Sequence, residues 1–211
     1  MDIAPRAFAT LLLLLFLGLN PLSGQALSPK DYPVSVNRIQ FSRTSSDWIQ
    51  AEIRLDIRDV PAALQPRNPK FADDVTVRLT LAFEDSTPSR PETPFRFFQA
   101  QTDIISMESR KPYTIYFFLP AEIRDRDDLG KDPFAGLVEL SIGGREIPIV
   151  PKDNLIGNLR AGSVEEFLRM ANSQSSETEG QMLGLAEVSP WIFQQTRLDV
   201  DRIPPIAPRK R

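Results

Sequence analysis

The sequence contains no histidine and no cysteine among its 211 residues. Without histidine it has neither a Ser-His-Asp triad nor a Cys-His pair. Without either residue type it cannot form the tetrahedral His/Cys sites that bind zinc. The lack of cysteine also excludes disulfides and removes the acylation site that a bacterial lipoprotein needs. An exported protein of this length must therefore be held together by the burial of its core.

Phosphate-binding glycine motifs are also absent, and no pattern in the sequence indicates a cofactor. The net charge is −3, and removing residues 1–26 takes away only Asp2 and Arg6, so the charge stays the same. A mildly acidic chain argues against a nucleic-acid partner. Proline, in contrast, is abundant, with 19 residues, which favours loops and sheet edges over long helices.

The one long apolar run lies at the N-terminus. Residues 11–19 are apolar apart from one glycine, follow Arg6, and precede the small residues of 24–26. This pattern is typical of a cleaved secretory signal peptide, with the cut after Ala26; a retained N-terminal anchor is the alternative. The run has about half of the ~20 residues that a spanning helix needs. We predict an exported protein, periplasmic or secreted, with no transmembrane segment after signal cleavage.

Residues 47–58 carry the clearest secondary-structure pattern. The odd positions from Ile49 to Ile57 are apolar and the even positions from Gln50 to Arg58 are polar. Such alternation gives a strand one buried face and one wet face, as in an antiparallel sheet covered on one side. Similar runs, the first with a break near Asn37 that suggests a bulge, occur at 33–43, 75–84, 95–100, 102–107, 113–119, 137–142 and 145–150.

The connection Gly143-Gly144 predicts a tight hairpin of type I′, because both central residues of that turn need positive φ. Pro148 cannot donate to a ladder, so we expect residues 145–150 to form an edge strand. Seven to eight strands at this spacing predict an all-β fold, namely an immunoglobulin-like antiparallel β-sandwich with a short C-terminal helix and an extended tail. A barrel is the structural alternative.

After residue 151 the pattern changes. Ser163 to Glu166 reads as a capping box that begins a helix of about ten residues, residues 172–180 look flexible, and the end is proline-rich and basic. We divide the chain into a signal peptide (1–26), an immunoglobulin-like β-sandwich domain (33–150), and a C-terminal helix, flexible segment and proline-rich tail (151–211).

Aromatic and edge residues are the candidates for partner binding. The run 113–119 is apolar on both faces, so its outward residues need a cover, for which the C-terminal helix is the natural element; without a cover they would form a partner site. The predicted edge strand offers main-chain pairing, and aromatic residues beyond the flexible segment either dock on the domain or anchor a partner. The predicted partner-binding residues are Tyr116, Phe118, Ile147, Ile149, Trp191 and Phe193.

Carboxylates could support other chemistry. The run 125–132 is similar to a calcium loop, but Leu129 and Gly136 stand where ligands belong, so we interpret it as a solvated loop; Asp73-Asp74 reads as a turn. A carboxylate-pair hydrolase would draw on polar strand positions, and a sugar-binding platform would use exposed aromatic residues. We predict that the protein is not an enzyme. The acidic residues considered are Glu52, Asp56, Glu84 and Glu139.

The tail carries a resemblance. An exported immunoglobulin-like sandwich, then a helix, then Ser189-Pro190-Trp191-Ile192-Phe193 and Asp201-Arg202-Ile203-Pro204, resembles secreted immunoglobulin-like proteins encoded beside type IV pilus-like machinery in some Gram-negative bacteria. The resemblance implies a non-enzymatic role with envelope or pilus-like protein partners. We therefore predict an exported, non-catalytic protein that mediates protein–protein contacts in such an assembly; an extracellular carbohydrate-binding module or a carboxylate-dependent hydrolase are the alternatives.

Overall fold

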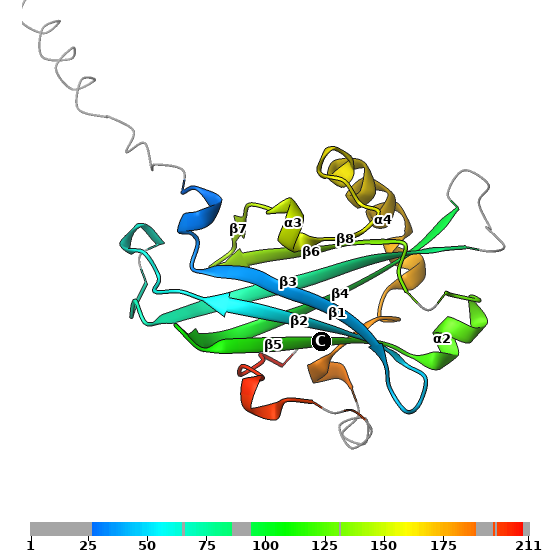
Figure 1. Ribbon diagram of the computed structural model, residues 1–211, viewed down its shortest axis with the longest axis horizontal. Coiled ribbons are helices and arrows are strands. Elements are labelled where there is room, and N and C mark those ends of the chain that lie inside the picture. Colours follow the sequence, from blue (N-terminus) through cyan, green and yellow to red (C-terminus); the bar gives the residue numbers. More distant parts are fainter. Residues whose placement is uncertain are drawn as a thin grey trace, which may run out of the picture.

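The computed structural model describes residues 27–64, 66–85, 94–130, 132–188, 196 and 198–208. Two antiparallel sheets face each other and enclose an apolar core (Figure 1). The all-β sandwich predicted from the alternating pattern is confirmed. The predicted signal peptide, 1–26, lies outside the described residues.

The first sheet has the order β1-β2-β5-β9 and the second the order β4-β3-β6-β7, with β8 also pairing with β6. The first, second and fifth strands thus share one sheet and the third, fourth, sixth and seventh share the other, an immunoglobulin-like arrangement. The strands are β1 (Val34–Arg43), β2 (Ile49–Ile57), β3 (Phe71–Glu84), β4 (Phe95–Glu108), β5 (Pro112–Leu119), β6 (Ala135–Ile142), β7 (Arg145–Ile147), β8 (Leu155–Gly157) and β9 (Leu183–Gly184).

Short helices connect the strands, and one longer helix packs on the second sheet. Within the described residues, no helix has both the length and the apolar character required to cross a bilayer. The α-helices are α2 (Ala121–Arg126), α3 (Pro151–Asn154) and α4 (Val164–Thr178), and the 3₁₀-helices are η1 (Pro29–Asp31), η2 (Ala62–Leu64), η3 (Ala161–Ser163), η4 (Leu185–Glu187) and η5 (Val200–Arg202).

The alternating residues of β2 form the centre of the core. Ile53 and Leu55 are fully buried between the sheets. The pairing of β1 with β2 shifts between Val36 and Arg38, so β1 has a bulge where its pattern breaks. One extra residue restores the inward direction of the following side chains, and Ile39 therefore packs against the same core as Val36.

Later segments of the chain lie on the outer faces of the sandwich (Figure 1), and each forms an apolar cluster with the sheet beneath it. On the second sheet, Phe167 and Ala171 of α4 pack against Phe97 and Leu137, and the rings of Phe97 and Phe167 meet edge to face at 5.3 Å. On the first sheet, the segment after α4 covers β5. This second cover consists of Leu183, Leu185, Val188, Leu198, Ile203 and Ile206.

Several boundaries differ from the sequence-based expectations. β4 is one continuous strand rather than two, because its outward Phe97 is covered by α4 and blurs the alternation. β7 ends at Ile147, before Pro148. Part of the predicted charged loop forms α2. α4 extends through Thr178, so most of the segment expected to be flexible is helical, and the Ser163 side chain makes no capping hydrogen bond.

Candidate partner-binding site

The outer edge of β4 is occupied by the chain's own C-terminal half. Near the start of β4, the Gln174 side chain acts as a substitute strand: the Phe97 N–H donates to its Oε1 at 3.4 Å, and its Nε2 donates to the Phe95 carbonyl at 3.1 Å. Near the end of β4, the Ile105 N–H donates to the Pro205 carbonyl and the Ala207 N–H donates to the Asp103 carbonyl. At both ends of this edge, backbone N–H and C=O groups of β4 are therefore hydrogen-bonded within the same chain.

The outer edge of β6 is filled in a similar way. β7 pairs with its last residues and β8 with its first, and the buried side chain of Asn154 bridges the gap between them. Asn154 Nδ2 donates to the Val138 carbonyl at 2.7 Å, and Oδ1 accepts from the Val150 N–H at 3.1 Å. β7 and β8 have only three residues each, which makes them poor templates for another chain.

Within the described residues, β1 is a long edge strand whose outer side pairs with no other segment. In the first sheet, β9 pairs with β5 at the opposite edge, whereas β1 pairs only with β2 among the described strands. The Thr44 N–H donates to the Trp48 carbonyl, and hydrogen-bonded pairs alternate along an antiparallel ladder. Ile39, Phe41 and Arg43 must therefore direct their N–H and C=O groups away from β2, and no backbone bond joins these groups to another described segment.

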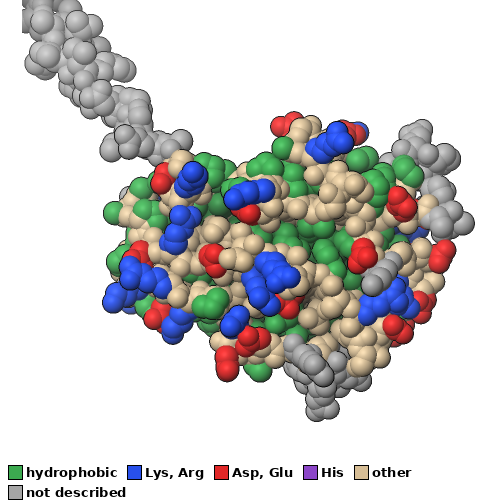
Figure 2. Space-filling view, in the orientation of Figure 1, with side chains coloured by type: hydrophobic (Ala, Val, Ile, Leu, Met, Phe, Trp, Pro, Cys, Tyr) green, Lys and Arg blue, Asp and Glu red, His purple; other side chains and the backbone are tan. Residues whose placement is uncertain are grey.

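The side chains beside this open edge are apolar on the inner face. Ile39 and Phe41 are only half-buried, although both pack against the inter-sheet core. Ile156, on β8 of the facing sheet, is half-buried in the same cluster. Figure 2 shows hydrophobic side chains reaching the surface along the middle of this face of the molecule, with charged side chains around them. The open edge thus combines unpaired backbone with apolar side chains.

An unbalanced charge lies on the outer face of the same strand. Arg38 stands directly opposite Arg54 in the register of β1 and β2, and like charges in such positions are unfavourable. Arg54 is neutralised by Glu52, since its Nε lies 2.7 Å from Oε1 of Glu52. Within the part of the chain that the structure describes, the side chain of Arg38 makes no hydrogen bond or ion pair.

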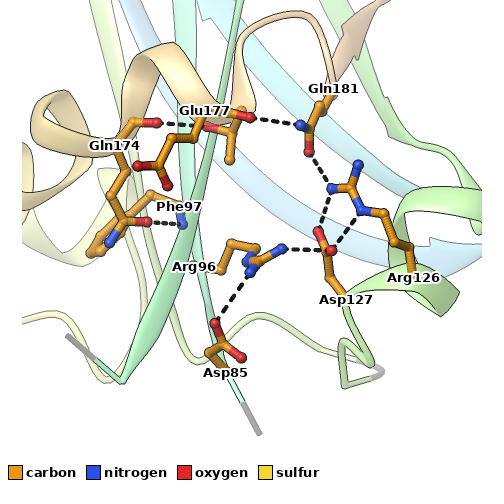
Figure 3. Close-up of polar contacts among 9 residues, drawn as sticks. Asp85, Arg96, Phe97, Arg126, Asp127, Gln174, Glu177 and Gln181 are labelled. Atoms are coloured by element: carbon orange, nitrogen blue, oxygen red, sulfur yellow. Dashed lines mark hydrogen bonds and ion pairs between the residues drawn. The ribbon is translucent and has the colours of Figure 1, made fainter. Parts of the chain in front are cut away.

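A buried ion-pair node joins the end of α2 to β4 (Figure 3). The Asp127 carboxylate, whose side chain is 3% exposed, accepts two hydrogen bonds of 2.7 Å from Arg126 and also pairs with Arg96. Burial raises the pKa of Asp127, but the hydrogen bonds from Arg126 and Arg96 together outweigh it and hold this pKa below its usual value. The node connects α2 to β4, and Arg126 also donates to Gln181, so it fixes the segment that follows α4.

A second buried carboxylate lies on the outer face of the second sheet. Oε2 of Glu139 is buried and has no hydrogen-bond partner. Burial raises the pKa of Glu139, and the opposing charge of Arg78, its cross-strand neighbour, offsets only part of this rise. Among the described residues, Oε2 of Glu139 is the buried side-chain polar atom that no hydrogen bond satisfies.

The residues predicted to bind partners are placed differently from the expectation. Tyr116 and Phe118 are 1% and 0% exposed, because the C-terminal segment, not the helix, covers them; the Asp199 N–H also donates to the Tyr116 hydroxyl at 3.2 Å. They form an internal docking face in this structure, which corrects the prediction of a partner patch. Ile147 is buried and Ile149 is half-buried against the α4 cluster. Trp191 and Phe193 lie outside the described residues.

The acidic residues considered for hydrolysis do not converge. Glu52 and Asp56 lie four residues apart on β2, a separation of about 13 Å along an extended strand. In the second sheet, Glu139 pairs with Arg78, six residues or about 20 Å from Glu84 along β3. Carboxylate-pair hydrolysis uses separations of about 5–10 Å. Among the described residues, no group of three or more acidic side chains is placed to hold a metal ion, including those of the 125–132 run.

Several aromatic side chains that a sugar platform could use are internal. Phe97, Phe98 and Phe117 are at most 1% exposed. The feature that sequence reasoning missed is the open β1 edge, for which the bulge near Asn37 was the available signal, since bulges are common at sheet edges. The edge strand predicted at 145–150 is present, because β7 is the last strand of the second sheet, but it ends at Ile147, before Pro148.

Comparison with known proteins supports the fold alone. No protein-family model matches the chain, and no curated protein matches it in sequence. A crystal structure of a protein from Akkermansia muciniphila is similar, with a TM-score of 0.59 and 15% sequence identity over 84% of this chain and 93% of that one. At this identity, the likeness supports the β-sandwich fold and nothing further.

Proposed function

We propose that this protein is an exported, non-catalytic β-sandwich protein that mediates protein–protein contacts in a cell-envelope or pilus-like assembly, and that the edge of β1 is its contact element. The N-terminal apolar run with its small-residue cleavage pattern supports export. The tail motifs 189–193 and 201–204 support the assembly context through their resemblance to secreted immunoglobulin-like proteins encoded beside pilus-like machinery.

The observation that carries the proposal is the contrast between edges. The chain supplies Gln174, Asn154, β9 and the 205–207 segment, which pair with parts of the three other edges. It leaves the ten-residue β1 uncovered in the described structure, with three residues that direct six backbone groups outward. Open strand edges recruit extended segments of other chains, because main-chain hydrogen bonds supply affinity and alternate side chains supply specificity.

The test uses one substitution that acts on the edge alone. Arg43→Pro removes an outward N–H without removing a bond to β2, whereas Arg43→Ala keeps the N–H and removes the side chain. A photo-crosslinking residue at Ser42 would report contacts in intact envelopes of the producing organism, with the same residue at the exposed Glu165 on α4 as the positional control.

We expect discrete crosslinked products from position 42 in the parent and in Arg43→Ala, and their loss in Arg43→Pro. Crosslinks that persist in Arg43→Pro, or the same products from position 165, would exclude β1 as the contact element. Circular dichroism of each variant checks that the sandwich remains folded.

A further inference from the structure

The geometry of the open side determines which kind of partner can lie there. β1 contacts β6 and α3 of the facing half of the sandwich, so the first sheet ends above β6. The second sheet continues beyond β6 to β7 and β8. A strand added beside Ile39 to Arg43 would therefore lie over β8, where it would give the first sheet the strand that it lacks on this side.

Because the second sheet extends beyond the edge of the first, a single extended segment fits beside β1 better than a second copy of the chain. If two copies paired through β1, their first sheets would join, and both second sheets would extend into the same space beneath the joint. A lone segment meets no such conflict. Its inward side chains would meet Ile39, Phe41 and Ile156, which are half-buried at present, so alternate positions of the segment should be apolar.

The charge of Arg38 on the outer face sets a second requirement for the sequence of the added segment. Arg38 faces Arg54, whose own charge is already balanced by Glu52. An added strand places its outward side chains next to those of β1, within the distance at which cross-strand pairs interact. An acidic residue beside Arg38 would neutralise it, and a basic residue there would add a third like charge.

We propose, on the basis of the proposed function, that β1 accepts one extended peptide segment with apolar residues at alternate positions and an acidic residue beside Arg38. The segment pairs with the outward groups of Ile39, Phe41 and Arg43. Its apolar side chains cover the inter-sheet core between β1 and β8, and its carboxylate pairs with the Arg38 guanidinium.

Two synthetic heptapeptides test this recognition directly. Both alternate valine and threonine, and they differ only in one outward residue, which is glutamate in the first and lysine in the second. Binding to the signal-cleaved full chain, measured by fluorescence anisotropy, should be about fivefold tighter for the glutamate peptide, a difference of about 1 kcal/mol at 1.4 kcal/mol per tenfold. Arg38→Glu should reverse this preference, and Arg43→Pro should abolish binding of both peptides.

Amide hydrogen exchange shows where on β1 the peptide binds. The glutamate peptide should slow exchange at Ile39, Phe41 and Arg43 and leave Gln40 and Ser42, which already bond to β2, unchanged. The inference is overturned if the glutamate peptide does not bind at millimolar concentration, if both peptides bind equally, or if Arg38→Glu leaves the preference as it was. If any of these negative peptide results occurs while Arg43→Pro still removes the native crosslinks from position 42, β1 remains the contact element. Only the proposed sequence of the bound segment is then wrong. If those crosslinks persist, the proposed function itself fails.

Discussion

Removing the buried carboxylate of the ion-pair node should weaken the whole fold. Asp127→Asn leaves Arg96 and Arg126 facing a neutral amide in a site where the Asp127 side chain is 3% exposed. Loss of one partner from a fully buried pair costs about 3–5 kcal/mol. Because the side chains of Arg96 and Arg126 are 26% and 51% exposed, water can solvate them in part, and we expect about 2 kcal/mol of lost stability.

Urea denaturation followed by tryptophan fluorescence measures this loss, and thermal unfolding should show a midpoint about 4–8 °C lower. The matched control is Asp125→Asn, two residues earlier in α2. The side chain of Asp125 is 65% exposed, so removing its charge should have little effect on the free energy of unfolding. A free energy of unfolding for Asp127→Asn that equals that of Asp125→Asn would refute the argument that the node stabilises the fold.

The pH dependence gives an independent check on the same residue. The pKa of Asp127 is lowered from 3.8 in the folded state, so the unfolded chain binds the proton first as the pH falls. The contribution of Asp127 to stability is therefore complete above about pH 4 and is lost as the pH falls through its folded pKa. The difference in unfolding free energy between parent and Asp127→Asn should stay constant from pH 7 to 5 and shrink below pH 4.

Three further predictions follow from other regions. Glu139→Gln should stabilise the protein by about 1 kcal/mol at pH 7. Because the pKa of Glu139 is raised above 4.5 in the folded state, the difference in unfolding free energy from the parent, measured by urea denaturation, should narrow as the pH falls through that raised pKa and be closed below 4.5; a difference that stays constant would contradict this. In the free protein, amide exchange should alternate along β1, fast at Ile39, Phe41 and Arg43 and slow at Gln40 and Ser42, and uniform rates would show that the edge is covered. Deleting residues 198–211 should uncover Tyr116 and Phe118 and increase the fluorescence of an apolar dye, whereas unchanged dye binding would mean that η4 alone covers them.

Local signals allowed the β-rich half of the fold to be predicted from the sequence. The alternation in 49–57 reports burial on one face, and Gly143-Gly144 adopts φ values of +54° and +74°, as the two-residue turn requires. The bulge in β1 was visible because the period of two breaks at Asn37. Each of these features depends only on residues that are close together in the chain, so a short stretch of sequence is enough to predict it.

Long-range coverage was the part that could not be predicted. The Gln174 side chain bonds to Phe97, 77 positions away, and no local pattern distinguishes it from a solvent-exposed helix residue. Tyr116 and Phe118 were expected to need a cover, but the two available covers, α4 and the segment after it, are both amphipathic in sequence. Only the structure determines that α4 packs on Phe97 and the later segment on Tyr116. The open edge of β1 depends on these same choices.

The segments that complete the two sheets lie near the C-terminus, which affects when the chain can finish folding. β9 pairs with Phe117 and Phe118, and residues 205–207 bond to Asp103 and Ile105, so segments about 70 to 100 positions apart complete the sheets together. A polypeptide that emerges N-terminus first cannot make these pairings until residue 207 has arrived. In the export that we propose, the chain would therefore cross the membrane before the last of these pairings forms, and its sheets would be completed only afterwards.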